Sequence, residues 1–84
     1  MFQKIHEVSS FEQGKIAEVY VKPLEYVYEW EPLFTIQTEN GSLAKVHVGA
    51  SGIIKDIHVT AGETIKADTV LAVIEDDLKL SGSD

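Results

Sequence analysis

The apolar positions of this chain occur twice in the same order. When Gly14 is placed on Gly52, a shift of 52 − 14 = 38 residues, apolar residues of the first half fall on apolar residues of the second half without a gap. The matched pairs are Ile5/Leu43, Val8/Val46, Ile16/Ile54, Val19/Ile57, Val21/Val59, Val27/Ile65, Leu33/Leu71 and Ile36/Ile74. This agreement indicates an internal repeat, and since solenoids need about three or more copies, two copies predict a closed object with a pseudo-twofold axis.

Each copy of the repeat has the pattern of several short strands. Ile16, Val19 and Val21 are separated mostly by polar residues, and Gly14 and Pro23 bound this run. Short alternating runs between turn residues are typical of β-strands. No stretch of about 10 residues has the 3.6-residue periodicity of an amphipathic helix. The sequence therefore predicts an all-β domain, a small sandwich or barrel.

The dipeptide Asn40-Gly41 predicts a tight hairpin between the strand-like segments 33–38 and 43–48. A two-residue type I′ turn requires positive φ at both central residues, and Asn and Gly tolerate this conformation best. At the shift of 38, the turn corresponds to positions 2–3 and 78–79. A twofold axis would therefore place the hairpin at one end of the domain and both chain termini at the other.

Charge and composition narrow the class of protein. The 84 residues form one domain with a formal net charge of −7, every basic residue is lysine, and there is no cysteine. The acidity disfavours nucleic acid, and it indicates either solubility or attraction to a basic partner surface. Disulfides and thiol chemistry are excluded. Because no apolar run approaches the roughly 20 residues that span a bilayer, and no signal peptide is recognisable, we expect a cytoplasmic protein without a membrane partner.

The second half of the chain resembles a known family. The segments 52–65 and 71–75 look like the second half of a biotinyl/lipoyl carrier domain, and the resemblance covers residues 5–76. It implies an all-β flattened sandwich (a barrel-sandwich hybrid) of two four-stranded sheets with quasi-twofold symmetry. We expect this domain to span residues 1–76, followed by a mobile tail over 77–84. The first half departs from the family pattern, because Leu24 and Trp30 stand where the family usually has glycine.

The resemblance also implies a cofactor site, which this sequence lacks. In the family, a lysine at the tip of the central hairpin receives biotin or lipoic acid through an amide bond. Counting forward from Ile36 places that position at Asn40, whereas counting back from Gly52 places it at Gly41. Neither residue offers an amine. Lys45 is the nearest lysine along the chain, but it falls in the following strand, where a cofactor arm would leave sideways.

These residues predict a non-enzymatic domain without a cofactor, which acts as a protein-interaction module related to carboxylase or acyl-transfer carriers. The partner would be another protein. The alternative is a functional biotin or lipoyl carrier that uses an atypical attachment site. Resemblance of fold alone does not decide between the two.

Aromatic residues are concentrated in the first copy of the repeat. They are Tyr20, Tyr26, Tyr28, Trp30 and Phe34, and their counterparts at the shift of 38 are His58, Thr64, Lys66, Asp68 and Ala72. These aromatics either form an exposed interaction surface or cover a thin core. We take Tyr26, Tyr28 and Trp30 as the candidate interaction surface.

No catalytic or metal-binding residues are expected. The histidines His6, His47 and His58 form no short-spaced cluster, whereas metal binding needs convergent ligands. The carboxylate run of residues 75–77 could hold a divalent cation weakly, but a solvated strand end is the simpler interpretation. We also recognise no Ser-His-Asp order and no phosphate-binding glycine loop.

Overall fold

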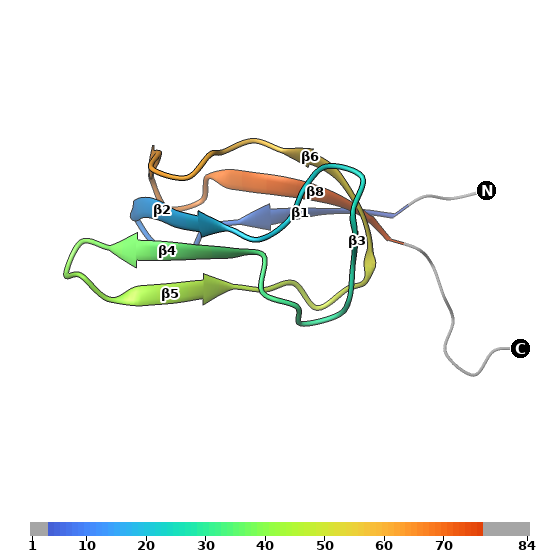
Figure 1. Cartoon of the computed structure of the whole chain (residues 1–84), viewed down its shortest axis with the longest axis horizontal. Coiled ribbons are helices and arrows are strands. Elements are labelled where there is room, and N and C mark those ends of the chain that lie inside the picture. The colour runs from blue at the N-terminus through green and yellow to red at the C-terminus, as the bar shows by residue number, and fades with distance from the viewer. Residues whose placement is uncertain (1–3, 77–84) are drawn as a thin grey trace, which may run out of the picture.

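The computed structural model describes residues 4–76 and forms two antiparallel sheets there (Figure 1). The strands are β1 (Ile5–Ser9), β2 (Gly14–Val19), β3 (Tyr26–Val27), β4 (Phe34–Thr38), β5 (Leu43–Val46), β6 (Gly52–Ile57), β7 (Thr64–Ile65) and β8 (Val70–Asp76). One four-stranded sheet has the order β1-β8-β6-β3 and the other has the order β5-β4-β2-β7. Neither sheet closes into a barrel, so the predicted flattened sandwich is confirmed. The described residues contain no helix that could cross a membrane.

The internal repeat is visible in the pairing of the strands. Gly14 pairs with Thr38 between β2 and β4, and Gly52 pairs with Asp76 between β6 and β8. Both strand pairs contain a bulge after the isoleucine at position 16 or 54, again at the shift of 38. Each sheet takes two strands from each copy of the repeat. Neither copy could therefore complete a sheet without the other.

The core consists of the repeated apolar positions. Ile16 and Ile54 are fully buried, and so are Leu33 and Leu71. Ile5 and Leu43 are exposed in both copies, so this pair does not contribute to the core. The copies differ at one large core position, where buried Phe34 of the first copy corresponds to buried Ala72 of the second. Burial of a Phe side chain stabilises a fold by about 1.5–3 kcal/mol.

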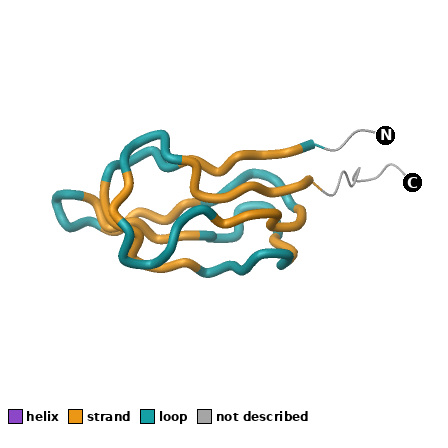
Figure 2. Tube along the Cα trace, turned by 90° about the horizontal axis from the view of Figure 1, so that it is seen from above, coloured by secondary structure: helices purple, strands orange, loops and turns teal. Residues whose placement is uncertain are grey.

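The domain has two distinct ends. The backbone N–H of Asp76 donates to the carbonyl of Lys4 at 2.8 Å, so the two ends of the described chain lie together. The β4–β5 hairpin lies at the opposite end (Figures 1 and 2). For residues 4–76 this arrangement agrees with the prediction from the repeat, and the termini themselves lie outside the described residues. We call the two regions the hairpin end and the chain end.

The predicted tail over 77–84 lies outside the described residues, and so does Asp77 of the carboxylate run. The domain boundary at residue 76 stays a prediction.

Candidate functional site

The hairpin is closed by a three-residue loop, not by the predicted two-residue turn. The N–H of Gly41 donates to the carbonyl of Thr38 at 2.9 Å, and the N–H of Thr38 donates to the carbonyl of Ser42 at 2.8 Å. Gly41 has a φ of 89°, whereas Asn40 is not among the residues with positive φ. The prediction of positive φ at both residues was therefore wrong. Glu39 and Asn40 are the central residues of a type I turn, and Gly41 supplies the left-handed residue of a G1 bulge.

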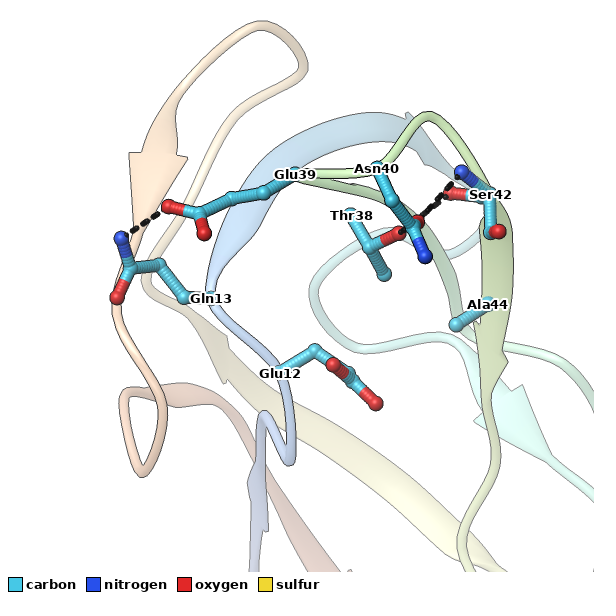
Figure 3. Close-up of a pocket in the computed structure, with 7 residues that line it drawn as sticks. All are labelled: Glu12, Gln13, Thr38, Glu39, Asn40, Ser42 and Ala44. Atoms are coloured by element: carbon cyan, nitrogen blue, oxygen red, sulfur yellow. Dashed lines mark hydrogen bonds between the residues drawn. The ribbon is translucent and has the colours of Figure 1, made fainter.

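Asn40 is folded back onto this turn. Its side-chain Oδ1 accepts a hydrogen bond from the Thr38 hydroxyl at 2.5 Å and one from the Ser42 N–H at 3.2 Å (Figure 3). These bonds stabilise the turn in the way that short polar side chains commonly do. The residue nearest to the expected attachment position thus contributes an acceptor to the turn.

Glu39 is held against the neighbouring loop. Its Oε2 accepts a hydrogen bond from Nε2 of Gln13 at 2.6 Å, which ties the hairpin to the loop between β1 and β2 (Figure 3). A shallow hollow of about 480 Å³ lies between these segments. It is lined by Glu12, Gln13, Thr38, Glu39, Asn40, Ser42 and Ala44. This lining provides carboxylates and amides but no amine.

The lysine closest to the tip in strand register is Lys15, which the sequence analysis missed. Lys15 lies opposite Gln37, next to the closing residue Thr38. Lys45, by contrast, lies opposite Thr35, farther along β4. Distance along the chain gave no indication of Lys15, because its position depends on the pairing of β2 with β4. The repeat does not indicate this pairing either, because the shift of 38 relates β2 to β6 and not to β4.

The structure separates the aromatic residues of the first copy. Phe34 is buried in the core, whereas Tyr28 is 69% exposed and Trp30 is 65% exposed. Tyr26 is partly buried, and its ring meets the Tyr28 ring edge-on with centroids 5.0 Å apart. Tyr20 is anchored by its hydroxyl, which lies 2.7 Å from Oγ1 of the buried Thr35. Of the candidate surface residues, Tyr28 and Trp30 are therefore exposed and Tyr26 is half-buried, and their role as an interaction surface stays a prediction.

The departures from the family pattern at Leu24 and Trp30 have a conformational cost. These residues have φ values of 71° and 67°. The counterpart of Leu24 is Gly62, which has a φ of 92°, and the counterpart of Trp30 is Asp68, at 67°. Left-handed backbone costs a residue with a Cβ roughly 1–2 kcal/mol, which Gly avoids. Leu24, which the sequence analysis did not place on the candidate surface, is 74% exposed.

Trp30 is fixed in place despite its exposure. Its N–H donates to the carbonyl of Val48 at 2.9 Å, and Nδ1 of His47 lies 3.1 Å from its carbonyl oxygen. The indole ring lies over Gly49 so closely that a Cβ there would come within 2.9 Å of the ring. The glycine therefore permits the ring to rest against the backbone.

The three histidines lie at different places in the fold. Nε2 of His6 lies 2.8 Å from Oδ2 of Asp76, which links β1 to β8 at the chain end. His47 contacts Trp30, and His58 lies exposed after β6. Within residues 4–76, no group of three or more histidine or carboxylate side chains is arranged to hold a metal ion.

Comparison with known proteins agrees with this architecture. The sequence profile of the family described as biotin-requiring enzymes, the biotin/lipoyl family, matches residues 4–74. A search of curated proteins gives no match. Among solved structures, the urea carboxylase of Kluyveromyces lactis is similar, with a TM-score of 0.77 and 18% sequence identity. The similarity covers 84% of this chain and 6% of that enzyme, so it concerns the fold of one small part. The profile match covers most of the chain, which therefore belongs to the biotin/lipoyl family.

Proposed function

We propose that this chain is a carrier-family domain that holds no biotin or lipoate at its hairpin tip and acts by binding another protein. The observation that carries the proposal is the composition of the tip, where Glu39, Asn40 and Gly41 stand in place of a lysine. Both cofactors are attached through an amide to an ε-amino group. The nitrogen of a side-chain amide is not a nucleophile, a carboxylate has no nitrogen, and glycine has no side chain.

The contacts at the tip support this interpretation. Asn40 holds the turn through its Oδ1, and Glu39 is bonded to Gln13. The side chains at the tip therefore stabilise the hairpin, and none of them extends as a flexible arm. The domain itself would be non-enzymatic, and its partner would be an enzyme domain of the carboxylase or acyl-transfer type. The likeness to one small part of a urea carboxylase motivates that choice.

A second candidate function is that of a carrier with an unusual attachment site. The observation that favours it is the position of Lys15, which is exposed and adjacent in register to the base of the hairpin. Lys15 lies in β2, so a cofactor arm attached to it would begin farther from the hairpin tip than one attached at position 40 or 41. Lys45 is a weaker choice because it lies farther along the hairpin.

Intact-mass measurement distinguishes the two functions. The chain is co-expressed with a biotin ligase and, separately, with a lipoate ligase, beside authentic biotin and lipoyl domains as positive controls. We expect the mass of the unmodified chain in both cases. A biotin-sized or lipoyl-sized adduct would overturn the proposal. Loss of that adduct in Lys15→Arg, with retention in Lys45→Arg, would establish the second candidate.

A further inference from the structure

We propose that Leu24, Tyr28 and Trp30 form a docking surface for a partner protein that offers an apolar pocket bordered by lysine or arginine. We call these three residues the chain-end patch. The inference deepens the proposed function and rests on it, since it names the surface through which the unmodified domain would bind. The patch belongs to the segment around β3, at the opposite end of the molecule from the hairpin (Figure 1).

The fold does not require these side chains. The second copy of the repeat follows the same backbone path with Gly62, Lys66 and Asp68 at the three equivalent positions. Leu24 and Trp30 nevertheless keep a positive φ, which is costly for large side chains. Conformations of this kind, when the structure around them maintains them, are concentrated at functional sites. The strain therefore points to a use outside the fold.

The three side chains also contribute little to the core. Their exposed fractions are 74% for Leu24, 69% for Tyr28 and 65% for Trp30. Cover of a thin core, the other interpretation of the aromatic residues, would require side chains that are mostly buried. Two of the three are held in place, because Tyr28 meets Tyr26 edge-on and Trp30 rests on Gly49. Rings fixed before binding lose less conformational entropy when a partner arrives.

The chemistry of the partner follows from the acidic residues between the apolar ones. Glu25, Glu29 and Glu31 alternate with the patch in sequence; the first two are exposed and the third is half-buried. Oε1 of Glu25 accepts from the N–H of Lys22 at 2.9 Å, and Oε1 of Glu31 accepts from the N–H of Tyr28 at 2.8 Å. These bonds fix the two carboxylates on the turns 22–25 and 28–31, which carry the three patch residues. Apolar anchors among fixed negative charges match an apolar pocket edged by cations.

The second copy lacks this combination. Glu25 has an acidic counterpart in Glu63, but the counterparts of Glu29 and Glu31 are Ala67 and Thr69. Apolar and acidic residues are thus found together in one copy only. A second molecule of this chain is a poor occupant, because each copy would bring its own acidic residues and a net charge of −7.

The test exchanges the patch for its counterpart in the second copy. The variant Leu24→Gly/Tyr28→Lys/Trp30→Asp introduces the residues that the second copy has at the equivalent positions 62, 66 and 68. The same backbone path therefore already occurs with these residues in the wild-type chain. Because the exchanges at positions 28 and 30 introduce charged side chains, a neutral variant, Leu24→Gly/Tyr28→Ser/Trp30→Gly, is measured beside it. Phe11→Ser serves as the control, since Phe11 is 87% exposed in the loop at the hairpin end.

The probe is a displayed library of random peptides, selected on the wild-type chain. We expect enriched peptides that combine aromatic or aliphatic residues with lysine or arginine. Both patch variants should weaken their binding by about tenfold or more, Phe11→Ser should leave it unchanged, and added salt should weaken it. The patch variants should unfold at the same urea concentration as the wild type or at a higher one.

Three results would overturn the inference. The first is peptides that bind the patch variants as tightly as the wild type. The second is a large drop in the urea midpoint of both patch variants, which would make the side chains core cover. The third is concentration-dependent dimerisation of the wild type that the variants abolish, which would make the patch a contact between copies. The mass measurement tests the proposed function separately, because an adduct at the hairpin end would leave binding at the patch unchanged.

Discussion

The segments 22–31 and 60–69 follow the same backbone path but present different surfaces. The N–H of Leu24 donates to the carbonyl of Ile54 at 2.7 Å, and the N–H of Gly62 donates to the carbonyl of Ile16 at the same distance. Trp30 and Asp68 share a φ of 67°. Main-chain hydrogen bonds therefore maintain this path, whereas the exposed side chains are free to differ.

The side chains that cap the turns show the same behaviour: the hydrogen bond recurs in both copies, even where the residue type differs. The Glu25 side chain accepts the N–H of Lys22 in the first copy, and Glu63 accepts the N–H of Thr60 in the second, at 3.1 Å. At the next turn, a Glu side chain caps one copy and a Thr hydroxyl, that of Thr69, caps the other. The acceptor is retained even where the residue type changes. The exposed residues Leu24, Tyr28 and Trp30 of the first copy have no such counterpart, because Gly62, Lys66 and Asp68 stand at their positions in the second.

The largest expected effect comes from the core, where Phe34 of one copy corresponds to Ala72 of the other. Phe34→Ala makes the copies alike but leaves a cavity, and we expect it to lower the free energy of unfolding by about 3–5 kcal/mol. Urea denaturation measures the loss. The double exchange Phe34→Ala/Ala72→Phe should recover part of it, because it transfers the ring across the pseudo-twofold axis. No recovery would show that the two halves of the core are not equivalent.

The hairpin supplies the next test, at a turn whose counterpart positions lie outside the described residues. Gly41 has a φ of 89°, and no atom lies within 4 Å of the place that an added Cβ would take. Gly41→Val should therefore destabilise the fold by backbone strain alone, by about 2 kcal/mol. Gly41→Asn is the matched control and should cost less, because Asn tolerates the left-handed conformation. Equal stability of the Val variant and the wild type would contradict the three-residue loop.

The variant Gly62→Leu tests whether the second copy tolerates leucine, the residue that the first copy has at the equivalent position 24. The site has a φ of 92° and no atom within 4 Å of the added Cβ, so the expected loss is again strain, about 1 kcal/mol. The urea midpoint checks it. A variant as stable as the wild type would mean that Leu24 is not strained either, so that its positive φ would not mark a docking surface.

The smallest effect is expected for the reverse change, Leu24→Gly. Relief of the left-handed strain is partly offset by the greater freedom of glycine in the unfolded chain, so we expect a gain of about 0.5 kcal/mol. Thermal and urea unfolding together resolve a change of this size. Leu24→Ala, which keeps a Cβ, is the control and should give no gain. A clear loss in Leu24→Gly would assign Leu24 to the core cover.

The fold was predictable because the repeat indicates where the strands lie and which of their residues are buried. Once Gly14 is aligned with Gly52, the bounds of β2 and β6 and the positions of their bulges correspond residue by residue. Burial follows the same correspondence, as at Ile16 and Ile54. An apolar pattern that recurs at one shift therefore indicates strand bounds and burial, because the matched side chains of both copies pack into the same core.

The details of the candidate site were less predictable, because they depend on contacts between distant residues. The sequence from Thr38 to Ser42 fits a two-residue or a three-residue loop, and the register of β4 against β5 decides between them. The proximity of Lys15 to the hairpin depends on a second pairing. The position of the Trp30 ring depends on Gly49, which allows the ring to lie against the backbone.

The contact between Lys4 and Asp76 makes the order of the two repeats interchangeable. Because residues 4 and 76 lie together and the hairpin lies at the opposite end of the domain, a short linker could join these two positions while the chain is opened at the hairpin tip. The resulting circular permutant would begin with the second repeat and end with the first, and every strand pairing of both sheets would be retained. The hairpin tip would then become a pair of free termini, which are common places for attaching a further domain.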